Sequence, residues 1–490
     1  MLQFGMETKR INDIVTRGAK TINDTEFLER ELQKFISSPK RKCMIDGDLY
    51  YDYEHAIKNK KRWVIGKDGE MMVDPHLPNN RYTDNQYGGM VDQKVNYLLS
   101  KPITFKTENE QYADILKQIF NKKFHRTLKN LGKDSYNGGI GWLYPYYDEQ
   151  GEFRIKKFHS WEVLPFWKDD DHTELDFAAR VYDVETYEGA TETTITYVEV
   201  YDTQGIHKFT FDGNTLTPDY STYYFELETD GEIIPYNWNK VPLIPFKGNS
   251  TETSLLKKCK SLQDGINYIL SSFGDGMEEN ASGNTIIVIK NYDGTDLGQF
   301  RHNLSQYKGV KVRTVDGADG GVDKLEIEVN CENYKSILQE LRKALIHNCK
   351  GYDVEELKSQ GSPNEMTIKA VYSQIDLDAN EIETEYQASF EELLWFVNQH
   401  LLNTGQGDFT AEDIEVIFNR DMMVNESQII ADINASSVIL SKKTCVAMHP
   451  YVEDVDAELE QIKSEQDEMI EQFGGAFEQK PEEDGDVIEE

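Results

Sequence analysis

Apolar side chains recur at spacings of three, four or seven positions without interruption from Met366 to Leu401. Such spacing places them on one face of an α-helix. Helices of globular domains average only about 10–14 residues, and a much longer one usually exceeds what a single compact core can cover. The pattern therefore predicts a long helix that serves an elongated assembly.

Two further helical patterns precede this segment, and a β-rich stretch separates them. Apolar residues at helical spacing predict one helix over 255–273 and another over 337–346. Asn249, with Glu252 three positions later, is the expected N-cap of the first. Between the helices, Gly-rich turns separate three short segments of strand-forming residues, at 285–289, 310–313 and 325–329. These segments predict a small β-module.

The N-terminal half combines helices with a sheet. Helical periodicity predicts helices near 27–36 and over 87–100, and Pro102 ends the second. From 140 to 247, aromatic and β-branched residues alternate with polar ones between Asp-Gly turns, which predicts an antiparallel sheet region. The remaining expected elements are a strand at 414–418 and helices at 425–440 and 453–473. The expected fold class is α+β.

The chain carries 52 Lys and Arg against 88 Asp and Glu, for a formal net charge of −36. Binding to duplex DNA depends on cations that displace counterions from phosphates, so this balance argues against ordinary nucleic-acid affinity. Basic residues concentrate before residue 134, whereas acids dominate after 450. The segment 476–490 combines Pro, Gly and like charges with almost nothing apolar, and we expect a disordered tail there.

No uncharged apolar stretch approaches the roughly 20 residues needed to cross a bilayer. The start of the chain lacks the basic and apolar regions of a secretion signal. We therefore expect a protein that folds in the cytoplasm and does not span a membrane. The cysteines form no CxxC pair, which indicates neither a disulfide framework nor a zinc site. We expect reduced, mostly buried thiols at Cys43, Cys259, Cys331, Cys349 and Cys445.

The sequence contains no Walker A loop, HExxH motif or nucleophile elbow, and we expect no cofactor. Gly138–Gly141 lacks the spacing of a phosphate loop and predicts a tight turn. Asp169–Asp171 could supply oxygen ligands to a hard cation, but they lack the spacing of an EF-hand, and a solvated loop is the favoured interpretation. Trp- and Tyr-rich sheet residues leave a carboxylate-based glycoside hydrolase open as an alternative, with Glu162 and Asp170 as its carboxylates.

Two basic clusters stand out in this acidic chain. Their members are Lys58, Lys60, Lys61 and Arg62 in the first, and Lys117, Lys122, Lys123, Arg126, Lys129 and Lys133 in the second. On a helix, Lys122, Arg126 and Lys129 share a face that could contact phosphate or an acidic neighbouring subunit, although a solvated face is the simpler interpretation.

Several short motifs then follow one another in a distinctive order. They are PNNR at 78–81, MVD at 90–92, YLLSKPI at 97–103, PLIPFKGN at 242–249, SPN at 362–364, SKKT at 441–444, HP at 449–450, VED at 452–454 and ELE at 458–460. Together with the helix, β-module, helix order, this set resembles the portal proteins of tailed bacteriophages, in the type common in long-tailed phages of Gram-positive bacteria. Pro363 replaces the glycine usual in that family. The likeness spans nearly the whole chain except the acidic tail.

The resemblance implies a ring-forming portal fold with an α/β wing, a long α-helical stem, a small β-rich clip and a helical crown. Carried onto this sequence, its parts are the wing at 1–248, stem helices at 249–282 and 334–349, the clip at 283–333, the tunnel loop at 350–364, a long helix and strand returning to the wing at 365–419, the crown at 420–475 and the acidic tail at 476–490.

The resemblance also implies a function. A portal forms a dodecameric ring at one vertex of the virion capsid, and double-stranded DNA passes through it during packaging and ejection without sequence specificity. The implied partners are other copies of the chain, the terminase large subunit, the head-to-tail adaptor, and the major capsid and scaffold proteins. Because the chain has no P-loop, the energy for packaging must come from a separate terminase, and we expect no enzymatic activity.

Three sets of residues are candidate contacts in such a ring. The tunnel-loop and DNA-channel candidates are Asp353, Val354, Glu355, Glu356, Leu357, Lys358 and Gln360, the stem-channel candidates are Lys257, Lys258 and Lys260, and the clip candidates for partner docking are Asp293, Gly294, Gly320 and Gly321. An acidic channel wall would repel phosphates and let DNA slide, although acids on the exterior would simply keep the ring soluble. A capsid assembly factor without a DNA channel remains a third interpretation.

Overall fold

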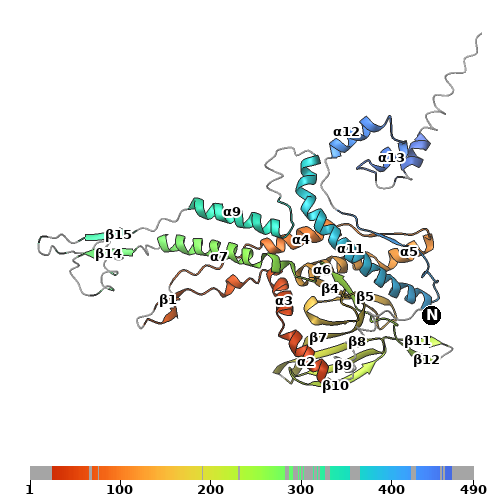
Figure 1. The fold of residues 1–490 in the computed structure, drawn as a ribbon, viewed down its shortest axis with the longest axis horizontal. Coiled ribbons are helices and arrows are strands. Elements are labelled where there is room, and N and C mark those ends of the chain that lie inside the picture. Colours follow the sequence, from red (N-terminus) through yellow and green to blue (C-terminus); the bar gives the residue numbers. More distant parts are fainter. Residues whose placement is uncertain are drawn as a thin grey trace, which may run out of the picture. The chain divides into compact units, whose positions relative to one another are not determined.

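The computed structural model describes residues 25–65, 69–75, 77–189, 191–229, 232–281, 286–290, 296, 298, 302, 313, 317, 321–325, 331–353, 365–420, 426–452, 455 and 458–465. The chain divides into two units. The first comprises Met1–Asp353 with Gln374–Asp421, and the second comprises Val354–Ser373 with Met422–Glu490. Figure 1 follows the elements along the chain.

Two antiparallel sheets form the β region of the first unit, as the alternation from 140 to 247 predicts. The larger has the order β10-β9-β8-β7-β6 and the smaller the order β13-β4-β5. Their strands are β4 (Ile140–Tyr147), β5 (Phe153–Phe158), β6 (Val163–Trp167), β7 (Leu175–Glu188), β8 (Thr191–Asp202), β9 (Gly205–Phe211), β10 (Leu216–Thr222) and β13 (Ile244–Lys247). Further short strands of the unit are β1 (Trp63–Ile65), β2 (Met71–Val73), β3 (Thr104–Lys106), β11 (Phe225–Thr229), β12 (Glu232–Tyr236) and β16 (Glu415–Ile417).

The helices of this unit include those predicted near 27–36 and over 87–100, 255–273 and 337–346, and most of the one predicted from Met366 to Leu401. They are α2 (Thr25–Ile36), α3 (Pro39–Tyr51), α4 (Gln86–Leu99), α5 (Glu110–Ile119), α6 (Lys122–Gly138), α7 (Leu255–Ala281), α9 (Cys331–Asn348) and most of α11 (Glu365–Asn403). Phe390 of α11 is fully buried. Its ring meets that of Phe246 in β13 edge-on, with centroids 5.4 Å apart. This contact fixes α11 against the smaller sheet.

Strand β7 serves two cores because successive side chains of a strand point to opposite faces. Ala178 packs with Trp142 of β4, so the two sheets share one core. Ala179 packs instead with Leu28 and Leu32 of α2. The larger sheet is therefore covered by the smaller sheet on one face and by α2 on the other.

Helices α7 and α9, which we call the stem pair, run antiparallel. The rings of Phe273 and Tyr334 lie 5.0 Å apart, and nearer the sheets Gly265 lies against Leu341. Beyond these contacts, β14 (Ile286–Lys290) pairs with β15 (Gly321–Leu325). Figure 1 shows the stem pair leading to these two strands.

The second unit contains α12 (Glu426–Ser436), α13 (Lys442–Ala447) and the first residues of α11. Ser441 caps α13, and its hydroxyl accepts a hydrogen bond from the Thr444 N–H. No side chain of α13 is buried. The predicted helix at 453–473 lies partly outside the described residues.

Three expectations need correction. Helix α7 begins at Leu255 because Asn249 bonds the backbone of Thr253 in a separate turn, and the Ser254 hydroxyl instead accepts the Leu256 N–H. The second described strand of the β-module begins at Gly321 rather than at Leu325. The cysteines are free thiols, but only Cys259 and Cys349 are buried. None of the described helices is both long and apolar enough to cross a membrane.

Candidate functional site

One face of α7 carries four polar side chains that hold an extended segment of the chain. Gln263, Asn267, Ser271 and Asp275 are spaced by four residues and are almost wholly buried. Their side-chain oxygens accept hydrogen bonds, in that order, from the backbone N–H groups of Tyr87, Asp84, Tyr82 and Asn80, at 2.9, 2.9, 3.0 and 2.6 Å. We call this arrangement the polar ladder.

The polar ladder forms because the rise of four helical residues nearly equals the rise of two residues in an extended chain. Four helical residues advance about 6.0 Å along the axis. Two residues of an extended chain advance about 6.6 Å. Each successive helix residue from Asn267 to Asp275 can therefore reach an alternate residue of the segment 80–84. The regular spacing of polar residues was visible in the sequence, but their partners were not.

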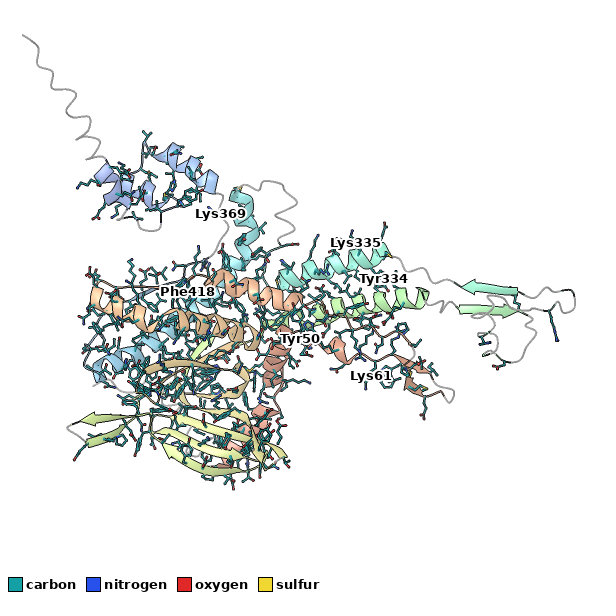
Figure 2. All side chains as sticks on the ribbon, turned by 180° about the vertical axis from the view of Figure 1, so that it is seen from behind. Tyr50, Lys61, Tyr334, Lys335, Lys369 and Phe418 are labelled. Carbon is teal, nitrogen blue, oxygen red and sulfur yellow. The ribbon has the colours of Figure 1, made fainter. Side chains whose placement is uncertain are left out.

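Asp275 is the charged end of the ladder. Its carboxylate lies 2.6 Å from Lys60 Nζ and 3.0 Å from an Arg62 nitrogen. Burial alone would raise the pKa of Asp275, but the hydrogen bonds from Lys60 and the Asn80 N–H outweigh it and bring the pKa below the ordinary value. Two members of the first basic cluster thus neutralise a buried acid of the stem. Figure 2 shows Lys61, the next residue of this cluster, beside α7.

Helix α9 is tied to the same extended segment. Arg342 donates two hydrogen bonds to one carboxylate oxygen of Asp84, at 2.8 and 3.1 Å. Gln263 of α7 also donates to the Asp84 carbonyl at 2.7 Å. Asp84 therefore links both helices of the stem pair to the start of α4.

The end of α9 is a closed Schellman turn, which directs the chain into the predicted tunnel loop. Lys350 has a left-handed backbone, with φ +53°. The Gly351 N–H bonds the Ile346 carbonyl at 2.9 Å, and the Lys350 N–H bonds the His347 carbonyl at 3.0 Å. A lysine in this conformation is less favourable than glycine, so tertiary contacts must hold it.

Those contacts come from α4. The Gln93 side-chain amide donates to the Tyr352 carbonyl at 2.9 Å and accepts from the Tyr352 N–H at 3.0 Å. Lys94 Nζ donates to the Lys350 carbonyl at 3.3 Å. The first residues of the predicted tunnel loop are therefore held against α4.

Lys94 also connects α4 with α11. Its ammonium, fully buried, lies 2.7 Å from the Asp378 carboxylate, which accepts a second hydrogen bond from the Tyr136 hydroxyl at 3.0 Å. Burial lowers the pKa of Lys94, and Asp378 opposes this effect. The helices before and after the loop are thus fixed to α4 by one side chain.

Arg420 also binds the part of α11 around Asp378. Its guanidinium donates to Asn380 at 2.5 Å, pairs with Glu383 and lies 3.4 Å from Asp376. The Tyr97 hydroxyl of α4 donates to Asp376 as well. Arg420 and its partners on α11 therefore form one hydrogen-bonded group, which Tyr97 joins to α4.

The structure describes five of the predicted contact residues, namely Lys257, Lys258, Lys260, Gly321 and Asp353. Lys257 and Lys258 are exposed on α7. Lys260 is not free, since its ammonium donates to the Tyr50 hydroxyl at 2.5 Å and lies 3.6 Å from Asp264. Asp353 is the last residue that the structure describes in the first part of the predicted tunnel loop. Gly321 begins β15, opposite Lys290. Val354, Glu355, Glu356, Leu357, Lys358, Gln360, Asp293, Gly294 and Gly320 lie outside the described residues.

The residues of the hydrolase alternative have structural partners or lie in solvent. Glu162 is buried and its carboxylate lies 2.8 Å from Arg180 Nε. Asp170 is exposed. Asp169 accepts hydrogen bonds from the Thr173 and Glu174 N–H groups and so closes its own loop. Within the described residues no group of three or more acids, histidines or cysteines could hold a metal ion.

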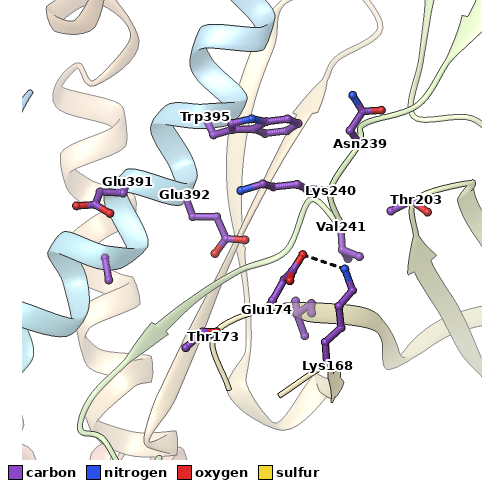
Figure 3. A pocket seen from close by; sticks show the side chains of 12 residues that line it. Lys168, Thr173, Glu174, Thr203, Asn239, Lys240, Val241, Glu391, Glu392 and Trp395 are labelled. Carbon is purple, nitrogen blue, oxygen red and sulfur yellow. Dashed lines mark hydrogen bonds and ion pairs between the residues drawn. The ribbon is translucent and has the colours of Figure 1, made fainter. Parts of the chain in front are cut away.

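A cavity of about 380 Å³ lies between α11 and the sheets. Figure 3 shows Glu392 and Trp395 of α11 facing Lys240, with the Lys168–Glu174 ion pair beneath. Lys240 Nζ lies 5.1 Å from the centre of the Trp395 ring. Burial raises the pKa of Glu392 to about 7. The lining mixes both charges, since Glu174, Glu391 and Glu392 lie there with Lys168 and Lys240.

Comparison with known sequences identifies the family. The family model described as phage portal protein, SPP1 Gp6-like, matches residues 40–472. The chain belongs to this portal family. The match ends before the acidic tail, as the motif order predicts. The Ser362-Pro363 junction lies inside the matched region, so Pro363 does not remove the chain from the family.

Two curated portal proteins are similar over most of their length. That of Bacillus phage SPP1 is 29% identical and covers 95% of this chain and 92% of its own. That of Clostridium phage phiCD119 is 26% identical, with coverages of 85% and 91%. Among solved structures, a chain from the neck of an empty GTA particle, computed with C6 symmetry, has 11% identity, coverages of 74% and 88%, and a TM-score of 0.38.

Proposed function

We propose that this chain forms a dodecameric ring at one vertex of a phage capsid and that double-stranded DNA passes through the ring. The observation that carries the proposal is the portal-family match across residues 40–472. The stem pair, the β-module beyond it and the long helix after the loop follow the order expected of a portal chain.

Within such a ring, the tunnel loop at 350–364 would approach the DNA. The clamps on Tyr352 and Lys350 support this proposal, because a loop that meets a moving polymer needs fixed ends. Lys257 and Lys258 remain candidates for channel contacts, since both are exposed. Lys260 is a weaker candidate because Tyr50 and Asp264 engage it.

The β-module is the proposed docking element for the terminase large subunit and, later, the head-to-tail adaptor. Among the described residues, β14 and β15 pair only with each other, and the outer edge of such a strand pair could accept a strand of a partner. Capsid and scaffold proteins would meet other surfaces of the ring. The proposed role is a structural conduit in the virion, and a separate ATPase would drive packaging.

Electron-microscope class averages of the purified protein, at low and moderate salt, test this function. We expect face-on rings of about a dozen subunits with a hole that admits duplex DNA, whose major groove alone is about 12 Å wide. Large oligomers without a hole would favour an assembly factor. Compact particles with glycosidase activity that Glu162→Gln abolishes would favour the hydrolase.

A further inference from the structure

The hairpin formed by β1 and β2, which we call the stem arm, exposes an unusual amount of apolar surface. Five of its side chains are large, apolar and between 40% and 75% exposed, namely Trp63, Ile65, Met71, Met72 and Val73. A two-stranded hairpin is at best marginally stable alone in water. A dense exposed apolar patch on a soluble protein usually marks an interaction site.

The stem arm is held in place at its root. Lys60 and Arg62 pair with the buried Asp275 of α7. The Asp74 N–H bonds the Arg62 carbonyl at 3.1 Å, and the Asn79 side chain donates to the Lys60 carbonyl at 3.1 Å. The root is therefore rigid, and the apolar side chains are presented from a defined position beside α7.

The arm and α9 lie on opposite sides of α7. Phe273 contacts Tyr334 of α9, whereas Asp275 bonds the root of the arm. Two residues apart on an α-helix point about 200° from one another, so these contacts lie on opposing faces. Figure 1 agrees, with α9 on one side of α7 and β1 on the other. The stem pair and the arm together therefore have the arm at one side and α9 at the opposite side.

A ring built by rotation brings two different surfaces of neighbouring copies together. The side of the stem opposite the arm offers a matching surface. Ile337 of α9 and Met277 of α7 are each 48% exposed. Glu332 and Glu340 of α9 are exposed, and neither has an ion-pair partner among the described residues. Lys61, at the root of the arm, is an exposed cation that likewise has none.

From this complementarity we propose that the stem arm of one copy packs on the stem pair of the next copy. The apolar side chains of the two arm strands would cover Ile337 and Met277, and Lys61 would approach the acids of α9. The inference rests on the proposed ring and specifies which surfaces join its stems. The ion-paired root explains why the arm would reach a neighbour in a fixed register.

Photo-crosslinking tests the contact directly. A benzophenone amino acid at position 72 is placed in heavy-isotope-labelled protein, which is mixed with unlabelled wild type and assembled. We expect crosslinked peptides that join the labelled arm to residues 265–281 or 331–343 of an unlabelled copy. Crosslinks confined to the arm's own chain, or to segments of another copy outside the stem pair, would overturn the inference.

A paired variant separates this inference from the proposed function. Ile65→Ser with Met72→Ser should leave thermal unfolding of the monomer unchanged but lower the yield of rings at a given concentration by about tenfold or more. Tyr187→Ser, at an equally exposed site on β7, is the matched control and should assemble normally. Rings of wild type and arm variant in equal yield would refute the arm contact alone. Absence of rings from wild type under every condition would refute the proposed function itself.

Discussion

The carboxylate of Asp275 lies 2.6 Å from the ammonium of Lys60, and both groups are almost completely withdrawn from solvent. Asp275→Ala would leave Lys60 and Arg62 without their anion and the Asn80 N–H without its acceptor. Because an uncompensated buried charge is costly, we expect the free energy of unfolding to fall by about 3 kcal/mol. Denaturant unfolding measures this value. Glu340→Ala, at an exposed position of α9, is the control and should change it by no more than about 0.5 kcal/mol.

The same ion pair predicts a pH dependence. The pKa of Asp275 is depressed in the folded protein, so the folded state holds fewer protons than the unfolded chain. This contribution is present above about pH 4, the ordinary Asp value, and is lost as the pH falls through the folded pKa. The stability gap between wild type and Asp275→Asn should therefore narrow below about pH 4. A gap that stays constant from neutral pH to pH 3 would refute this assignment.

The sequence predicts the long helices because their apolar periodicity is local. Met366 to Leu401 reads as one helix, and α11 spans it. The polar ladder could not be predicted in the same way, since Asn267 and Ser271 bond backbone groups more than 180 positions away. Asn249 failed as a cap for a similar reason. Glu252, its expected capping partner, instead pairs with Lys40 and His172 from other elements.

The stem arm could not be predicted because no local sequence pattern indicates it. Its strands have three residues each, and their apolar side chains are not buried in the chain's own core. The position of the arm depends on Asp275, which follows it by some 200 residues. The family resemblance predicts a stem and a tunnel loop, but only the coordinates relate Lys60 to α7.

Replacing either of two glycines near the Gln93–Tyr352 contact by alanine should change the stability, and the two changes should have opposite signs. A Cβ at Gly351 would lie 2.6 Å from the Met90 sulfur and 2.8 Å from the Gln93 side-chain oxygen. We expect Gly351→Ala to destabilise the protein by about 1–3 kcal/mol through this overpacking. Gly89 lies in α4 with no atom within 4 Å of an added Cβ. Gly89→Ala should stabilise by about 0.5–1 kcal/mol. Denaturation midpoints that shift in the same direction would contradict this account of the contact.

The buried Lys94–Asp378 pair suits a double-mutant cycle. Asp378→Ala leaves a buried ammonium without a counter-ion, and we expect a loss of about 3–5 kcal/mol. Lys94→Met with Asp378→Ala removes both charges, so the double variant should be more stable than Asp378→Ala alone. The unfolding free energies of the four proteins give the coupling. Additive effects of the two substitutions would show that the ion pair contributes nothing beyond its separate side chains.

Glu392 predicts a change in stability on the neutral side of the pH scale. Burial raises its pKa to about 7 in the folded protein. The unfolded chain ionises near the ordinary Glu value of about 4.3, so the folded state binds more protons between these values and stability falls as the pH rises through this window. Gln cannot ionise.

Glu392→Gln should therefore exceed wild type in stability at pH 8, by at most about 4 kcal/mol, and the difference should vanish near pH 4. Glu391→Gln, at the exposed neighbouring position, supplies the matched control and should track wild type across the range. Chemical unfolding at several pH values measures all three proteins. If Glu392→Gln also tracked wild type, the Lys240 ammonium would have to compensate the buried carboxylate fully, and the charges of this cavity would then act as one ion pair.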